Sequence, residues 1–314
     1  MKLVTRFAPS PTGRLHLGHA FSALLAHDLA RSRGGAFLLR IEDIDPGRCR
    51  PEHVDSIIED LAWLGIDWDG EIIFQSERLG LYRDALDRLK SAGLAYPCFC
   101  TRAAIAAEIA ASAAAPHGPD GPLYPGRCRR LSPEERQRRM ALQPHAWRLD
   151  LKAALASLLP GEGRGPDGAP EPGPGLRRGA DAPAPALYWR DGDTEVQAEP
   201  EAHGDVVLAR KDAPVSYHLA VTVDDAAQGV TDVVRGRDLY AATDVHRLLQ
   251  ALLGLPTPLY HHHPLLLDPQ GRRLAKRNGA PTLLELRESG VDPKRLAADL
   301  LTGQMPYGYS AADT

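Results

Sequence analysis

Two histidines three residues apart lie in a segment rich in proline and glycine near the N-terminus. The segment RFAPSPTGRLHLGHA, residues 6–20, carries His16 and His19 where a predicted strand at residues 3–7 turns into a predicted helix. Free backbone N–H groups at a helix N-terminus suit an anion, and the helix dipole adds roughly 0.3–1 kcal/mol for a negative charge. Histidines at this spacing could both donate to one phosphate group, although a bare pair is more often two surface side chains.

A basic loop far downstream is a second candidate for phosphate binding. GRRLAKRNG, residues 271–279, is bounded by glycines and precedes a helical pattern. The mobile ammonium of Lys276 could follow the charge that spreads over phosphate oxygens in a transition state. Basic turns are common, so this loop gains weight only when it is paired with the histidine segment.

Charged residues also follow two predicted strands, as a site for an acidic amino acid would need. Arg6 ends the strand at residues 3–7, and Glu42 follows the strand FLLRI at residues 37–41. Both would lie at the carboxyl edge of a parallel sheet, where ligands bind in open α/β folds. Such a site needs cations for two carboxylates and an acceptor for an ammonium group, and Arg6, Ser10 and Glu42 could supply some of these; the planar fork of an arginine suits a carboxylate. For an arbitrary arginine and glutamate, a surface ion pair would be the simpler explanation.

Clustered cysteines suggest a metal site. Most of the cysteines lie in one region, at Cys98, Cys100 and Cys128. Thiolates suit tetrahedral Zn²⁺, and four cysteines in 314 residues are too few for a disulfide framework. On chemistry alone His117 would be preferred to Tyr124 as fourth ligand, because imidazole is the commoner zinc ligand. The alternative is a set of reduced structural cysteines; Cys49 lies outside the cluster and has no assigned function.

The elements that must position these groups alternate between strand and helix. The predicted order is a strand at 3–7, a helix from about His19 to Gly34-Gly35, a strand at 37–41, and helices from Pro51 to Gly65 and from about Glu77 to Gly93. This order favours a parallel sheet with crossover helices. We therefore expect an α/β fold, a Rossmann-type doubly wound parallel sheet with a zinc-bearing insertion and a short helical C-terminal region.

The alternation ends at Pro97. A capping box at Ser132-Pro133-Glu134-Glu135 predicts a helix start, and the residues at 160–186 are so rich in Pro, Gly and Ala that we expect a disordered loop. Strand-like sequence returns near Asp205, followed by helical stretches at 241–253 and 282–301. The predicted divisions are a first catalytic half at 1–96, an insertion at 97–186, a second catalytic half at 187–253, and the basic loop with a helical region at 254–314.

Size and composition exclude few functions. The chain has 314 residues, of which 43% are hydrophobic, so it can bury a full-sized core. It lacks a secretory signal pattern and a bilayer-spanning apolar run, so we expect a soluble, cytoplasmic protein. A net charge of −4 gives no overall reason to bind nucleic acid. Local basic clusters are more often a solvated face than an RNA site; they lie at Arg127/Arg129/Arg130, Arg136/Arg138/Arg139 and Arg272/Arg273/Lys276/Arg277.

The segment RFAPSPTGRLHLGH resembles the first signature of class I aminoacyl-tRNA synthetases, in the version carried by the glutamyl and glutaminyl branch. The resemblance implies that His16 and His19 stabilise the phosphates of ATP while an amino-acid carboxylate attacks the α-phosphorus. It also implies ATP contacts at Pro9 and Gly18, where the missing side chain of glycine would let adenine approach. GRRLAKRNG is similar to the Lys-Met-Ser-Lys-Ser loop, with Lys276 as its second lysine. It departs from that pattern at Arg273, Ala275 and Arg277.

Further segments resemble the glutamate pocket and a zinc site. RIEDID and residues 216–239 are similar to the glutamyl branch, which favours a helix at 217–224 and implies a glutamate site of Arg6, Ala8, Ser10, Glu42, Tyr217 and Arg235. His218 stands at a variable position and is assigned no role. Cys-x-Cys followed by Tyr-x-x-x-Cys resembles the structural zinc site of glutamyl-queuosine tRNA(Asp) synthetases, which implies the ligands Cys98, Cys100, Tyr124 and Cys128.

The resemblance covers about residues 1–150 and 187–300, and the sequence ends about forty residues after the basic loop. We therefore expect no anticodon-binding domain. The resemblance implies an enzyme that uses ATP with Mg²⁺ to activate L-glutamate without tRNA, and then transfers it to queuosine in the anticodon of tRNA(Asp). We expect it to act as a monomer, although the sequence alone does not give the oligomeric state. The alternatives are a shortened glutamyl-tRNA synthetase that charges a tRNA 3′ end, and a non-catalytic paralogue that binds tRNA or adenylate.

Overall fold

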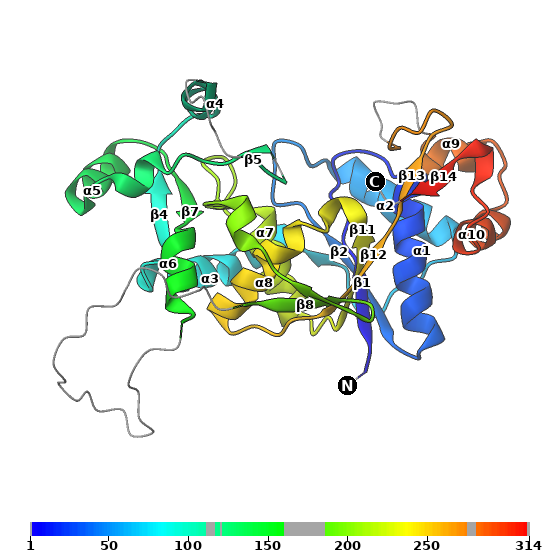
Figure 1. The fold of residues 1–314 in the computed structure, drawn as a ribbon. Coiled ribbons are helices and arrows are strands. Elements are labelled where there is room, and N and C mark those ends of the chain that lie inside the picture. Colours follow the sequence, from blue (N-terminus) through cyan, green and yellow to red (C-terminus); the bar gives the residue numbers. More distant parts are fainter. Residues whose placement is uncertain (1, 111–116, 120, 160–185, 275–280, 313–314) are drawn as a thin grey trace.

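A computed structural model describes residues 2–110, 117–119, 121–159, 186–274 and 281–312 (Figure 1). The segment expected to be a disordered loop falls almost wholly outside the described residues, as do Lys276 and the centre of the basic loop. Within the described ranges, no helix combines the length and the apolar character needed to cross a membrane.

The N-terminal half alternates strand and helix as predicted. Its elements are β1 (Val4–Phe7), α1 (Leu17–Ser32), β2 (Ala36–Ile41), α2 (Pro51–Trp63), β3 (Ile73–Phe74) and α3 (Leu79–Ser91). β2 is parallel to both β1 and β3, which confirms the crossover arrangement. The helix expected from about His19 begins at Leu17, because the side chain of His16 caps it. The helix expected from about Glu77 begins after a 3₁₀ turn at Gln75–Arg78.

The second half brings further strands beside β1. They are β8 (Tyr188–Asp191), β9 (Thr194–Gln197), β11 (Asp232–Gly236) and β12 (Leu259–His263); β11, β12 and β8 are parallel in that order, with β9 antiparallel to β8. The carbonyl of Val4 accepts from the backbone N–H of Thr231 at 3.0 Å, and the N–H of Val4 donates to the Thr231 hydroxyl at 2.8 Å. β11 therefore lies beside β1, and the two groups of parallel strands meet there.

Helices cover these strands with two apolar clusters. α7 (Tyr217–Ala227) confirms the helix that the resemblance favoured at 217–224, and it packs with α3 and α8 (Ala242–Leu253) around the buried Trp189 and Tyr260. The other cluster joins α1, β2 and α2 to the C-terminal helices. Trp189 of β8 and Tyr260 of β12 are each 2% exposed, and they hold the cluster around α7 against these two strands.

The insertion shares an antiparallel sheet with the chain on either side of it. β4 (Ala95–Cys98) pairs with β7 (Ala146–Leu149), which pairs with β10 (Val207–Ala209). The helices around this sheet are α4 (Arg102–Ala110), α5 (Pro133–Leu142) and α6 (Leu151–Ser157). Ser132 caps α5 as predicted by accepting from the N–H of Glu135. The reciprocal half of the expected capping box is not formed, because the Glu135 carboxylate pairs with Arg138 and Arg139 instead.

The C-terminal region corrects one prediction. The helical stretch expected at 282–301 is two helices, α9 (Leu283–Glu288) and α10 (Pro293–Leu301). The chain turns at Gly290, whose φ of 80° suits glycine, and Asp292 caps the second helix. β13 (Leu265–Leu267) pairs with β14 (Ser310–Ala312) beside them. In Figure 1 this region and the insertion lie at opposite ends of the molecule, with the parallel strands between them.

Two consecutive carboxylates of α7 join the halves of the catalytic core. Asp224, which is fully buried, accepts from Tyr82 Oη at 2.7 Å, from Gln75 Nε2 at 2.8 Å and from Arg78 Nε at 2.7 Å. All three donors belong to the 3₁₀ turn or to α3, so Asp224 fixes those elements to α7. Losing a charge from such a network leaves buried donors without their partner.

We expect Asp224→Asn to lower the free energy of unfolding by about 3–5 kcal/mol, because an amide cannot replace both carboxylate oxygens that accept from these buried donors. Urea denaturation followed by circular dichroism measures the change. Asp193→Asn is the matched control, since Asp193 is fully exposed and its loss should change the free energy by less than about 0.5 kcal/mol. Equal stabilities of the two variants would contradict the structural role of Asp224.

Candidate functional site

A cavity of about 570 Å³ opens where β1 and β11 end. It lies at the carboxyl ends of parallel strands and beside the N-terminus of α1, the place at which α/β sheets bind ligands. All the residues expected to bind ATP or the amino acid line this one cavity, except Lys276, which lies outside the described residues: Arg6, Ala8, Pro9, Ser10, His16, Gly18, His19, Glu42, Tyr217 and Arg235.

The two histidines form the N-terminal cap of α1 with each other's backbone. Nδ1 of His16 accepts from the N–H of Gly18, and Nδ1 of His19 accepts from the N–H of His16, both at 3.1 Å. Because each Nδ1 is an acceptor, a neutral ring carries its proton on Nε2 and donates there. The ring centroids lie 3.9 Å apart, and both side chains of this donor pair line the cavity.

Gly18 makes this arrangement possible in a way that the sequence did not reveal. A Cβ atom at position 18 would lie 3.0 Å from Cε1 and 3.2 Å from Nδ1 of His16. Any side chain here would therefore press on the ring that caps the helix. Besides admitting a ligand close to the backbone, this glycine keeps His16 in its capping position.

Arg6 and Glu42 of the predicted amino-acid pocket belong to one buried network of charged side chains. Arg6 donates to Asp225 through Nε at 3.0 Å, and Arg40 contacts the same carboxylate at 2.9 Å. Glu42 lies 3.6 Å from Arg40. Burial raises the pKa of Glu42 to about 7, outweighing the opposite effects of Arg40 and Arg6. Near neutral pH, Glu42 is poised between its neutral form and a carboxylate that would accept from an ammonium group.

Arg235 reaches the cavity from β11 and is 5% exposed. Its Nη2 donates to the hydroxyl of Thr243 at 2.6 Å and to the carbonyl of Leu239 at 3.1 Å. Tyr217 lines the same cavity from the first residue of α7, and burial raises the pKa of its hydroxyl, which stays protonated. The cavity thus combines fixed cations with a neutral phenol.

On the basic-loop side, Arg273 forms an ion pair with Asp238 at 2.6 Å, and both side chains line the cavity. Arg273 was expected at the first lysine position of the loop, and the structure places it at the rim. Ala275, Lys276 and Arg277 lie outside the described residues. The ion pair holds Arg273 against Asp238 in the cavity wall.

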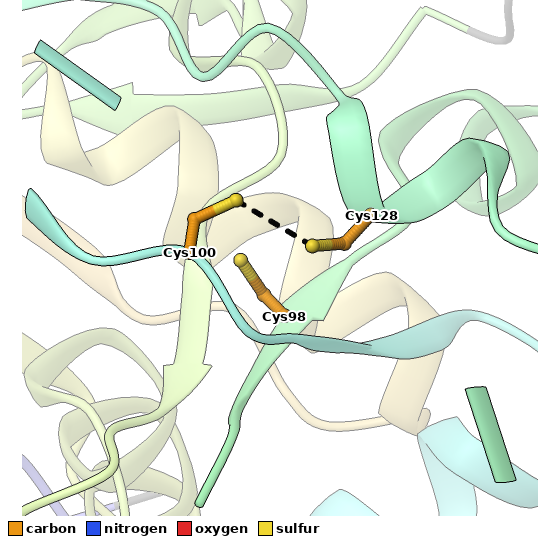
Figure 2. A group of neighbouring side chains, drawn as sticks. All are labelled: Cys98, Cys100 and Cys128. Carbon is orange, nitrogen blue, oxygen red and sulfur yellow. Dashed lines mark hydrogen bonds between the residues drawn. The ribbon is translucent and has the colours of Figure 1, made fainter. Parts of the chain in front are cut away.

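The cysteines of the insertion converge (Figure 2). The Sγ atoms of Cys98, Cys100 and Cys128 all lie within 4.8 Å of one another, with Cys100 and Cys128 at 3.5 Å. Tyr124 Oη lies 3.5 Å from the Sγ atoms of Cys98 and Cys100. His117 begins a two-residue strand, and its side chain lies outside the described part of the chain. Cys49 lies away from the cluster, as expected, with its thiol near the carbonyl of Glu42.

A second and larger cavity, of about 1120 Å³, separates the insertion from the catalytic core. Tyr217 lines both cavities, so this one side chain borders the amino-acid pocket on one side and the second cavity on the other. Its walls carry the basic side chains of Arg48, Arg102, Arg148, Arg210 and Lys211. Arg48 and Arg210 are paired with Asp45 of the same wall, and Arg210 is also paired with Asp212. The sequence did not single out this set, because its members come from segments far apart in the chain.

The arginine clusters noted in the sequence behave differently from one another. Arg129 is paired with Asp205 at 3.1 Å, and Arg138 and Arg139 are paired with Glu135. Arg127 and Arg130 are exposed on the surface of the insertion. Part of the apparent basic patch is therefore neutralised within the fold.

Comparisons with known proteins agree with this geometry. Residues 2–156 and 176–306 match the family "tRNA synthetases class I (E and Q), catalytic domain". The chain is 50% identical to a glutamyl-Q tRNA(Asp) synthetase of Rhodobacter capsulatus over 93% of this chain and 97% of that protein. It is 45% identical to the protein of that name from Symbiobacterium thermophilum, over 95% of this chain and 85% of that one.

Solved structures place the fold in the same group. The chain is similar to the crystal structure of a glutamate-tRNA synthetase from Elizabethkingia anophelis, with a TM-score of 0.75 and 26% identity over 96% of this chain. It spans 62% of the length of that protein. The chain therefore belongs to the class I tRNA synthetases of the glutamate and glutamine type, and its fold is their α/β catalytic fold with a parallel sheet.

Proposed function

We propose that this chain activates L-glutamate with ATP, forming glutamyl-adenylate and pyrophosphate, and transfers the glutamyl group to queuosine at the first anticodon position of tRNA(Asp). The observation that carries the proposal is the single cavity in which the donor pair, the arginines and the buried glutamate meet. The names of the relatives at 50% and 45% identity support the acceptor.

The residues have complementary tasks in the activation step. Arg6 and Arg235 bind carboxylates of glutamate, while Glu42 and Ser10 accept from its ammonium group. The Nε2 protons of His16 and His19 stabilise charge on the phosphates as a glutamate carboxylate oxygen attacks the α-phosphorus and pyrophosphate leaves. Lys276 adds a mobile cation from the loop, and Mg²⁺ accompanies ATP as part of the substrate.

Zinc fits the donor set of the insertion. A tetrahedral zinc ion with bonds of about 2.3 Å to sulfur keeps its sulfur ligands about 3.8 Å apart. The thiol of Cys100 lies 3.5 Å from that of Cys128, and the Tyr124 hydroxyl lies at the same distance from two of the thiols. When bound, the ion would fix the loop around Tyr124 to the end of β4 and so shape the wall of the second cavity.

The second cavity is the entrance that we propose for the acceptor. A hydroxyl of the queuosine cyclopentenediol would attack the carbonyl carbon of the adenylate, and AMP would leave with its phosphate oxygen. RNA loops can present an unstacked base in this way, and the basic walls suit the neighbouring phosphates. We also propose that the enzyme acts in the cytoplasm as a monomer, in which the divisions at 1–96, 97–186, 187–253 and 254–314 form one catalytic unit.

Transfer of labelled glutamate tests the proposed function. We expect glutamate-dependent pyrophosphate exchange without tRNA, and labelling of tRNA from cells that make queuosine but not from cells that lack it. Labelling of both pools alike would instead indicate charging of a tRNA 3′ end. Absence of pyrophosphate exchange would contradict activation altogether.

The raised pKa of Glu42 predicts the pH dependence of glutamate use. Only the carboxylate accepts from the ammonium group, so kcat/KM for glutamate should fall as the pH drops below about 7 and be roughly tenfold lower at pH 6. Pyrophosphate exchange at varied glutamate and saturating ATP measures it. Glu42→Gln should lower kcat/KM for glutamate at every pH and remove its fall below about pH 7. If kcat/KM for glutamate still falls below about pH 7 in Glu42→Gln, the pH dependence must come from the titration of another group.

Removing a ligand should remove the metal. We expect about one equivalent of zinc in the purified protein, and well under half of that in Cys98→Ser, because the remaining ligands hold the ion less tightly. Elemental analysis of protein prepared without chelators measures the content, and Cys49→Ser, which changes a cysteine outside the cluster, should retain it. Tyr124→Phe tests the fourth ligand. Undiminished zinc in Tyr124→Phe would leave the thiols as ligands and exclude the phenol.

A further inference from the structure

Arg235 is buried among acceptors that carry no charge. Besides Thr243 and Leu239, its guanidinium donates through Nε to His262 Nε2 at 3.1 Å and through Nη1 to His246 Nδ1 at 3.2 Å. Among the residues that the structure describes, no carboxylate lies within ion-pair distance of Arg235. Arg6 is different, because it shares its charge with Asp225.

The hydrogen bonds fix the protonation state of both histidines. A guanidinium can only donate, so the ring nitrogens facing Arg235 must be unprotonated. Asp191 Oδ1 lies 3.1 Å from Nδ1 of His262 and accepts from the backbone N–H of His262 at 3.0 Å, which places the ring proton on Nδ1. In His246 the proton is on Nε2, which faces Nδ1 of His218 at 3.2 Å. Both rings are therefore neutral partners of a cation.

Burial and the neighbouring charge keep them neutral. Burial, followed by Arg235, lowers the pKa of His246 well below its usual value. The same two causes lower the pKa of His262 to about 4, although Asp191 opposes them. Both side chains are essentially inaccessible to water, with exposures of 2% for His246 and 0% for the His262 ring. Neither ring gains a charge at neutral pH.

We propose that His246 and His262 are positioning residues that satisfy the donors of Arg235 without neutralising it, so that its charge remains available to a carboxylate of the amino-acid substrate. This inference rests on the proposed activation of glutamate at the same cavity. A buried cation without a counter-ion is costly, and a substrate carboxylate that enters beside it removes that cost. A protein carboxylate in the place of either ring would compete with the substrate for the guanidinium.

Two variants of nearly equal size separate positioning from charge. His246→Asn keeps a neutral acceptor beside Arg235, whereas His246→Asp adds a carboxylate there. In pyrophosphate exchange we expect KM for glutamate to be at least about tenfold higher in His246→Asp than in His246→Asn, with KM for ATP within about twofold in both. At the second position, His262→Gln should restore most of the glutamate affinity that is lost in His262→Ala, because its amide oxygen can accept from Nε. If His246→Asp does not fold, the comparison of His262→Gln with His262→Ala tests the inference on its own.

The neighbouring histidine gives a matched control. His261 lies on the same strand, β12, and its Nε2 contacts Asp232 at 2.8 Å, away from Arg235. His261→Ala should leave KM for glutamate within about twofold of the wild-type value. Equal KM values for glutamate in His246→Asn and His246→Asp, equal rises of KM for both substrates, or no rescue by His262→Gln would overturn the inference. Wild-type protein that lacks glutamate-dependent exchange would instead overturn the proposed function, and the inference with it.

Discussion

The amino-acid cavity depends on two adjacent carboxylates in α7. Asp225 binds Arg6 of β1 and Arg40 of β2, while Asp224 accepts from the turn and helix that follow β3. A buried arginine without a partner is costly, so the N-terminal strands must dock where α7 presents these carboxylates. Docking in turn brings Arg6 opposite the residues supplied by α7 and β11. The pocket is a consequence of this one set of ion pairs between the two halves of the chain.

The same network divides the cations of the site by function. Arg6 and Arg40 share the carboxylate of Asp225. Arg40 also lies 3.8 Å from Asp224 and 3.6 Å from Glu42, so the task of these two arginines includes holding the fold together. Arg235 is satisfied by neutral imidazoles, a hydroxyl and a carbonyl instead. Its guanidinium is held by several hydrogen bonds, but no described carboxylate beside it offsets its charge. Rigidity and available charge are thereby combined in one side chain, which is what preorganised recognition of an anion needs.

Short segments of the sequence were sufficient to predict the structure wherever neighbouring residues determine it. The strand-to-helix turn and the parallel strands follow from short segments, and the structure confirms their arrangement. The predicted site residues that the structure describes line one cavity, and their roles stay predictions. Short segments were insufficient where partners are distant, as for Asp225 with Arg6, 219 residues apart, or Arg235 with His262. The acidic pair inside an otherwise apolar helix was the one available signal. The break at Gly290 was missed because the hydrophobic period continues on both sides of it.

α7 also connects the two steps of the proposed reaction. Its first residue, Tyr217, lines both cavities, and Ser216 caps the helix just before it. Two turns further on, the same helix carries the carboxylates that align the arginines. Any shift of α7 that weakened the carboxylate network would therefore also move the wall between the site of activation and the entrance for the acceptor. One helix therefore sets the positions of the arginines in the first cavity and of the side chain that borders both cavities.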